Sequence, residues 1–122
     1  MRLADLRIET VGRVVVARLD GEIDLSNATE LGGVIADRVP NEALGLVIDL
    51  TKVDYVDSAG IHVLFELRAK LRNRGQEIAL VVPPGAEIFE ALRIAYLPGV
   101  VGVFDSLDSA TESIADKPPP GH

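Results

Sequence analysis

The chain has 122 residues, 48 % of them hydrophobic, and carries a formal net charge of -7 with no cysteine. This length suits one domain with a buried core, and the missing cysteine excludes disulfides, a thiolate nucleophile and cysteine-based metal sites. An acidic balance disfavours tracking of nucleic-acid phosphates, and no window approaches the ~20 apolar residues of a transmembrane helix. We therefore expect a cytoplasmic domain that binds neither nucleic acid nor membrane and needs no cofactor.

The first third of the chain predicts a β-hairpin followed by a helix. The runs 6–9 and 14–19, which include β-branched residues, flank a turn at Gly12, a pattern typical of paired strands. Apolar residues then recur at helical spacing, at Ala28, Leu31, Ile35 and Val39. Pro40 ends this helix, and its N-cap candidates are Asp24, Ser26 and Asn27.

The rest of the chain alternates between buried strands and amphipathic helices. We expect strands at 45–50, 77–82 and 100–104, helices at about 58–74, 88–95 and 106–115, and a loop through Asp54 and Asp57. Apolar strands that alternate with helices indicate a parallel sheet covered by helices. The predicted fold is a single α/β domain over 1–116, with a mixed, mostly parallel sheet of about five strands, an N-terminal hairpin and about four helices. Residues 117–122 are expected to be a disordered tail.

Enzymatic motifs are missing. There is no phosphate-binding loop and no Gly-x-Gly-x-x-Gly. A catalytic triad would have to combine Ser58 with His62 on one helix, without the nucleophile elbow that such serines use. His62 is therefore interpreted as a surface histidine, and the carboxylates of Asp20, Glu22 and Asp24 as a solvated turn rather than a metal site. We expect no catalytic residue and no metal.

Asp49 raises a second alternative, because it lies at the end of a buried strand, where receiver domains hold a phospho-accepting aspartate. Such domains resemble one another in a lysine after the last strand. Here Phe104 is followed by Asp105 and Ser106. We therefore interpret Asp49 as structural.

Ser58 is the residue of greatest interest. Serine favours the helix N-cap, so its own chemistry supports only a cap. However, the segment 55–57 brings Ser58 to a strand-to-helix junction, where sites gather in parallel sheets. Ala59 and Gly60 leave little bulk beside its hydroxyl, and a glycine in the first helical turn costs about 1 kcal/mol relative to alanine.

The helix that begins at Ser58 also has two distinct faces. Rotation by ~100° per residue predicts a core stripe of Gly60, Val63, Leu64, Leu67 and Leu71. Another face carries a strip that could contact a partner protein, made of Ser58, Ile61, His62, Phe65 and Ala69. A phenylalanine on such a face is expected to be partly tucked into a neighbour.

Three segments of the sequence resemble the STAS domains of bacterial anti-sigma-factor antagonists. They are Gly21–Asp24 before the first helix, Leu46–Leu50 as the central strand, and Val53–Gly60, which contains Asp57-Ser58-Ala59-Gly60. The resemblance extends to about Ala115. It implies that Ser58 is phosphorylated by an anti-sigma factor that is also a serine kinase, that a phosphatase restores the active form, and that Asp24 and Asp57 flank the modified site.

The resemblance therefore implies a non-enzymatic antagonist that binds this kinase and frees a sigma factor until Ser58 is phosphorylated. The predicted contact residues are Asp24, Asp57, Ser58, Ala59, Gly60, Ile61, His62 and Phe65. An alternative remains open, in which the chain is a STAS scaffold subunit of a stress-sensing or lipid-transport assembly without a phosphoswitch.

Overall fold

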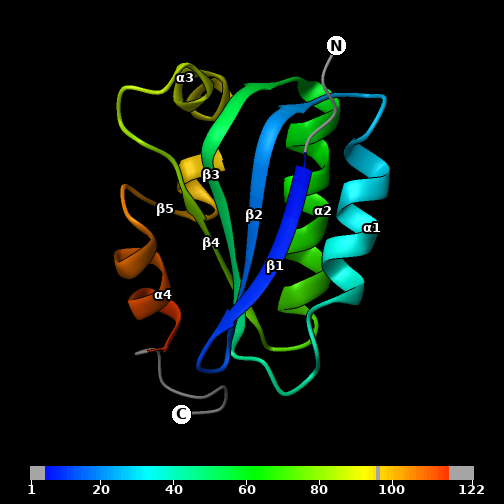
Figure 1. Ribbon diagram of the computed structural model, residues 1–122, viewed down its shortest axis with the longest axis vertical. Helices are drawn as coiled ribbons and strands as arrows, with labels where there is room; N and C mark the ends of the chain where they lie inside the picture. Colours follow the sequence, from blue (N-terminus) through cyan, green and yellow to red (C-terminus); the bar gives the residue numbers. More distant parts are fainter. Residues whose placement is uncertain (1–4, 96, 116–122) are drawn as a thin grey trace.

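The computed structural model describes residues 5–95 and 97–115 and shows a five-stranded sheet in the order β1-β2-β3-β4-β5 (Figure 1). The elements follow the chain as β1 Asp5–Val11, β2 Val14–Ile23, α1 Ala28–Asp37, β3 Gly45–Val56, α2 Ser58–Arg72, β4 Glu77–Val81, α3 Glu87–Ile94, a short 3-10 helix Leu97–Gly99, β5 Gly102–Phe104 and α4 Leu107–Ala115. β1 is antiparallel to β2, and the other neighbours are parallel. The fold is thus the predicted α/β domain with an N-terminal hairpin.

The hairpin forms because two β-branched runs are joined by a two-residue turn. Val11 pairs with Val14 across Gly12 and Arg13. Gly12 has a φ of 60°, which glycine adopts without strain, and it holds the first central position of the turn, where tight hairpins favour glycine. The turn therefore fixes the register of all seven residue pairs between β1 and β2.

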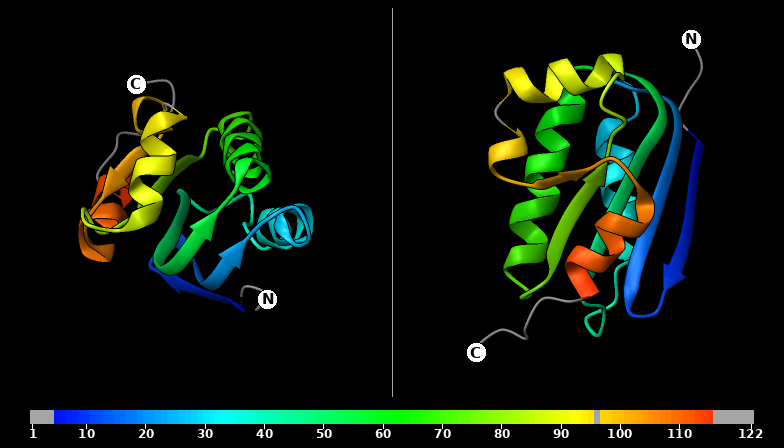
Figure 2. Two further views of the ribbon diagram at one scale, coloured as in Figure 1. Left: turned by 90° about the horizontal axis from the view of Figure 1, so that it is seen from above. Right: turned by 90° about the vertical axis from the view of Figure 1, so that its left-hand side faces the viewer.

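The main core lies between the sheet and the pair α1 and α2, which cover one face (Figure 2). Alternate residues of the central strands point to these helices and are almost fully buried, as with Leu46, Ile48 and Leu50. Helix α2 contributes Gly60, Leu64, Leu67 and Leu71 to this core, and Val63 is half-buried. Four of the five residues of the predicted core stripe are therefore buried, in a domain whose interior is mainly aliphatic.

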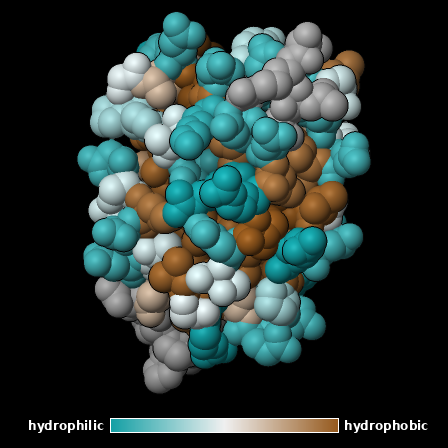
Figure 3. Space-filling view, viewed as in Figure 1, coloured by the Kyte–Doolittle hydropathy of each residue, from teal (hydrophilic) through white to brown (hydrophobic). Residues whose placement is uncertain are grey.

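The opposite face of the sheet is covered only in part, by α4. Ala110 and Ile114 of α4 pack on Val16, Val47 and Ala79. Beyond α4, ion pairs join Arg18 to Glu9 and to Asp49 on neighbouring strands. Hydrophilic side chains interrupt the apolar ones across this face (Figure 3). The open face is therefore not a continuous apolar surface that would require a second layer.

Strand β3 is longer than the sequence indicates. It extends through Val56, so that Asp54 and Tyr55 lie in a strand rather than in the predicted loop. The reason is tertiary, because β2 also continues to Ile23 and pairs with Val56 after two shifts of register. These irregularities remove the period-two alternation by which an isolated strand is recognised.

Other boundaries differ at the ends of elements. Helix α2 ends at Arg72 instead of Arg74, and the last strand begins at Gly102 because a 3-10 helix precedes it. The N-cap of α2 is Asp57, so the cap role that the chemistry of serine by itself supports for Ser58 is filled by its neighbour. The predicted tail 117–122 lies outside the described residues.

Two neighbouring glycines in α1, Gly32 and Gly33, differ in how closely they approach α2. A methyl group on Gly32 would lie 2.6 Å from Cγ1 of Val63, whereas one on Gly33 meets nothing within 4 Å. We expect Gly32→Ala to lower the free energy of unfolding by about 1–3 kcal/mol through overpacking. Gly33→Ala is the matched control and should raise it by up to about 1 kcal/mol. Urea unfolding measures both, and equal effects would contradict the packing argument.

Candidate partner-binding site

The residues singled out by the sequence meet where β2 and β3 end and α2 begins. Ile23 is opposite Val56 in the sheet, and the amide of Asp57 donates to the carbonyl of Ile23 at 3.1 Å. Helix α2 starts at the next residue, Ser58. The strand-to-helix junction predicted for Ser58 is therefore present, and it is fixed to β2 as well as to β3.

Asp57 organises this junction through both carboxylate oxygens. Oδ1 accepts from the amide of Gly60, and Oδ2 accepts from the amide of Leu25, each at 3.1 Å. The first bond caps α2, and the second reaches 32 residues back to the loop after β2. One side chain thus joins the start of the helix to the loop that precedes α1.

That loop is ordered by its own side chains. Asn27 accepts from the amide of Asp24 at 3.0 Å and donates to the carbonyl of Glu22 at 2.8 Å. Asp24 in turn accepts from the amide and the hydroxyl of Ser26. Asn27 is the N-cap of α1, but its side chain holds the loop rather than the first turn of the helix. Asp24 is only 8 % exposed, so its main role in the structure is local.

The surface around the junction combines a polar hydroxyl with exposed apolar side chains. Ser58 is exposed, and Leu25 and Tyr55 are 80 % and 48 % exposed. An open hollow of about 610 Å³ lies here, lined by Glu22, Asp24, Leu25, Ser26, Tyr55 and Asp57. Large exposed apolar groups beside polar ones are typical of protein contact surfaces.

The first turn of α2 shows why its residues are small. A methyl group on Gly60 would lie 2.9 Å from side-chain atoms of both Ile23 and Val56. Gly60 is buried, so its size serves packing on the sheet and it is not part of the surface. Ala59 is half-buried and lies between Gly60 and exposed Ser58.

The predicted strip along α2 is present in a mixed form. His62 and Ala69 are exposed, whereas Ile61 and Phe65 are half-buried and pack against the main core. The expectation that Phe65 is partly tucked in is therefore confirmed. Nε2 of His62 lies 3.1 Å from Oε1 of Glu66, one turn further along a solvent-exposed side of the helix.

The other candidates for chemistry have structural roles. Asp49 is 8 % exposed and accepts from the amide of Thr51 at 2.9 Å, with Arg18 at 3.9 Å. Asp20, Glu22 and Asp24 do not form a metal-binding cluster, and no group of three possible metal ligands occurs within residues 5–95 and 97–115.

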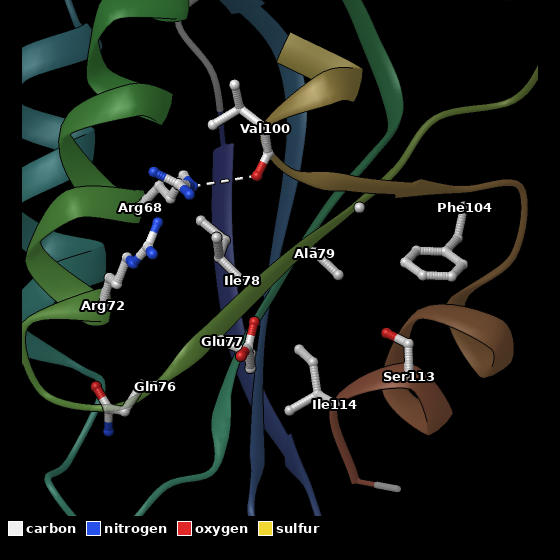
Figure 4. Close-up of a pocket in the computed structure, with 11 residues that line it drawn as sticks. Arg68, Arg72, Gln76, Glu77, Ile78, Ala79, Val100, Phe104, Ser113 and Ile114 are labelled. Atoms are coloured by element: carbon white, nitrogen blue, oxygen red, sulfur yellow. Dashed lines mark hydrogen bonds between the residues drawn. The ribbon is translucent and has the colours of Figure 1, made fainter. Parts of the chain in front are cut away.

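A second hollow lies far from Ser58, between α2 and α4 at the edge of β4 (Figure 4). It has a volume of about 350 Å³, and its lining includes Arg68, Arg72, Phe104 and Ile114. Arg68 donates through Nε to the carbonyl of Val100 at 3.1 Å. This bond ties α2 to the segment before β5, so the arginine is engaged in the fold.

Sequence reasoning missed Leu25 and Tyr55. Leu25 stands alone between Asp24 and Ser26, and Tyr55 stands in a segment that alternates with aspartates. Exposed apolar residues of this kind are common on protein surfaces. The only signal was their position beside Asp24 and Asp57. Their proximity follows from the bond between Asp57 and the Leu25 amide.

Most of the chain matches one known protein family. The model of the family described as STAS domain matches residues 5–110. The chain belongs to the STAS domain family. Within the described residues of this STAS domain, no helix is both long enough and apolar enough to cross a bilayer.

Several of the proteins similar to this STAS domain are named as anti-sigma factor antagonists. BtrV of Bordetella bronchiseptica, named as an anti-sigma factor antagonist, is 27 % identical over 112 residues, covering 90 % of this chain and 91 % of BtrV. The anti-sigma-F factor antagonist RsfB of Mycobacterium tuberculosis is 29 % identical over 102 residues, covering 83 % and 81 %. The crystal structure of an anti-sigma factor antagonist from Mycobacterium paratuberculosis superposes with a TM-score of 0.83 at 25 % identity, over 93 % of this chain and 96 % of that one.

Removal of the Asp57 carboxylate tests its bridging role in the STAS domain. Asp57→Ala leaves the amides of Gly60 and Leu25 without their acceptor, so we expect a loss of about 1–3 kcal/mol in the free energy of unfolding. Hydrogen exchange should also accelerate at the Leu25 amide. Asp54→Ala, an exposed position two residues before Val56, is the control and should change stability by less than about 0.5 kcal/mol. Unchanged exchange at Leu25 in Asp57→Ala would contradict the bridge.

Proposed function

We propose that this STAS domain is an anti-sigma factor antagonist that binds an anti-sigma factor with serine kinase activity and thereby frees a sigma factor. Phosphorylation of Ser58 ends this binding, and a phosphatase restores it. The observation that carries the proposal is an exposed serine hydroxyl at the first position of α2, on a scaffold whose relatives are named anti-sigma factor antagonists.

Accessibility supports Ser58 as the modified residue. Its side chain is exposed, and the cap of the helix is the neighbouring Asp57. The hydroxyl is therefore not needed to satisfy the first amides of α2. A kinase can reach it, and a phosphate on it removes no stabilising hydrogen bond of the cap. The fold is expected to tolerate modification.

The surroundings of Ser58 support a surface for protein contact. Leu25 and Tyr55 offer exposed apolar area near the hydroxyl, and His62 continues the exposed surface by one helical turn. We assign partner contact to these three residues together with Ser58, Ile61 and Phe65. The fold buries the other predicted contact residues wholly or in part, so we assign them a structural role beneath this surface. They are Asp24, Asp57, Ala59 and Gly60.

The negative charge of a phosphate on Ser58 would weaken binding to the partner. A phosphate adds about 1.5–2 negative charges, which the N-terminus of α2 favours by about 0.3–1 kcal/mol. Asp57 adjoins Ser58, so the phosphate adds negative charge beside an acidic side chain of the contact surface. A like-charge pair ~4 Å apart costs ~4 kcal/mol at an effective dielectric of ~20. Contact with an acidic or closely fitting partner is then lost without unfolding this domain.

Ser58→Ala tests the site of modification. We expect it to retain binding to the anti-sigma factor, because Ser58 is not the cap, but to abolish phosphate incorporation. The measurement is co-purification of both variants from the native cell, with mass spectrometry of the partner and of this chain. Ser109→Ala, another exposed serine at a helix start, is the control and should be phosphorylated normally. Phosphate on another residue of Ser58→Ala would overturn the assignment.

Ser58→Asp tests the charge mechanism. We expect it to fold normally and to bind the co-purified anti-sigma factor at least about tenfold more weakly. Ser58→Asn adds a side chain of similar size without charge, so it separates repulsion from bulk. If both variants lose the same binding affinity, the switch depends on steric fit rather than charge. If Ser58→Asp binds as tightly as the wild type, the charge mechanism is refuted. A stable complex with no modification of Ser58 would instead indicate a scaffold subunit.

A further inference from the structure

We infer that two copies of this chain associate through the free edge of β1, as an antiparallel pair of β1 strands around a two-fold axis at Ile8. The resulting sheet runs through both copies. This surface involves neither Ser58 nor its surroundings, so the inference is independent of the proposed function.

The free edge is long and regular. Among the strands that the structure describes, β1 has a neighbour on one side only, and it contains seven residues in uninterrupted register with β2. Figure 2 shows this strand at the outer border of the sheet. Edge strands are usually protected by proline, by a bulge, by charged side chains or by a covering element. Asp5–Val11 contains no proline and no bulge. Its charged residues, Asp5, Arg7 and Glu9, include both signs, so they repel a second copy in some registers and attract it in others.

The hairpin determines which backbone groups point outward. The residues that flank a two-residue turn form a hydrogen-bonded pair, and such pairs alternate along antiparallel strands. Val11 and Val14 flank the turn, so Glu9 and Arg7 also bond to β2. The amides and carbonyls of Leu6, Ile8 and Thr10 therefore point away from β2, toward the free edge.

This alternation restricts the registers of a two-fold dimer. With the axis at Ile8, that residue forms a hydrogen-bonded pair with Ile8 of the second copy. Leu6 then pairs with Thr10 of the second copy in the same way, and Arg7 comes directly opposite Glu9 of the second copy. The whole of Asp5–Val11 is matched, and all three outward-pointing residues have partners.

Charge selects this register over its neighbours. An axis at Arg7 would place two arginines opposite each other and Asp5 opposite Glu9, whereas an axis at Glu9 would place two glutamates opposite each other. Like charges directly opposite destabilise a strand pair, and opposite charges stabilise it. Only the axis at Ile8 gives two opposite-charge pairs over the full strand.

Three residues of β1 have unused capacity for contact in the monomer: the charged Arg7 and the apolar Leu6 and Ile8. Arg7 is exposed and has no ion-pair partner within the described part of the chain, and its cross-strand neighbour is Arg18, a like charge. Leu6 and Ile8 are only half-buried at the edge of the main core. A second copy places its Glu9 opposite Arg7, so that this carboxylate is shared between Arg18 of its own chain, to which it is bonded at 2.5 Å, and Arg7. The second copy also covers both apolar side chains.

Charge reversal gives a test with an internal complement. Arg7→Glu and Glu9→Arg should each bring like charges together in the dimer, and each should weaken self-association roughly tenfold to hundredfold. A 1:1 mixture of the two variants should associate again, because every 7–9 pair then joins a glutamate to an arginine. Sedimentation velocity with the purified full chain measures all three samples, and circular dichroism checks folding.

A backbone variant tests the edge without altering charge. Thr10→Pro removes an outward-pointing amide that β2 does not use, so it should abolish the dimer and leave the hairpin folded. Thr10→Ala is the control and should dimerise like the wild type. Amide exchange should show protection of Leu6, Ile8 and Thr10 that rises with protein concentration, whereas Arg7 and Glu9 are protected throughout.

Each outcome decides the inference. Restored association in the mixture together with concentration-dependent protection of the three outward amides supports it. A wild-type chain that sediments as a monomer at about 1 mM overturns it. A dimer that survives in Arg7→Glu, Glu9→Arg and Thr10→Pro also overturns it, because the contact surface must then lie elsewhere.

Discussion

The bridge made by the Asp57 carboxylate is the interaction on which the candidate site depends. Its two oxygens hold the start of α2 and the loop after β2, while its amide is bonded to the end of β2. Two segments distant in sequence, residues 23–25 and 57–60, are thereby fixed at one corner of the sheet. Ser58 is the first residue beyond this anchor, so its position is set by the sheet rather than by a flexible loop.

This arrangement separates stability from signalling. The groups that order the corner, Asp24, Asn27, Asp57 and Gly60, are buried wholly or in part and are hydrogen-bonded or closely packed. The groups that face solvent, Ser58, Leu25 and Tyr55, contribute little to the fold. A charge added at Ser58 therefore changes the affinity of the surface for a partner without removing the hydrogen bonds and packing that stabilise this corner. A phosphoswitch in a small domain needs this property, because net stability is only about 5–15 kcal/mol.

The two ends of the sheet present different surfaces. Toward the β5 end, residues of α2, β4, β5 and α4 line a hollow in which Arg68 is already bonded to Val100. The β1 edge instead offers unpaired backbone groups with a self-complementary sequence of charges. The proposed contact with a kinase at the corner of Ser58 and the inferred self-association along β1 use separate parts of the molecule, so the two contacts are compatible in one assembly.

The sequence by itself determined the local structure and the place of the serine. Helical spacing and β-branched runs act over a few residues, so the hairpin, the order of elements, the core stripe of α2 and the strand-to-helix junction were predictable. The resemblance added the STAS family, which the family comparison confirms. Phosphorylation of Ser58 and contact through the predicted residues stay predictions.

Only the tertiary structure decided what depends on partners distant in the chain. Residues 51–56 form a strand because β2 extends beside them, with shifts of register that conceal the alternation. Asp57 rather than Ser58 caps α2, because its carboxylate also reaches Leu25. Leu25 and Tyr55 are candidate contact residues because the fold leaves their side chains exposed, whereas Gly60 is not one because the fold buries it. Exposure is a property of how elements pack together, and a single sequence does not contain the distances that fix it.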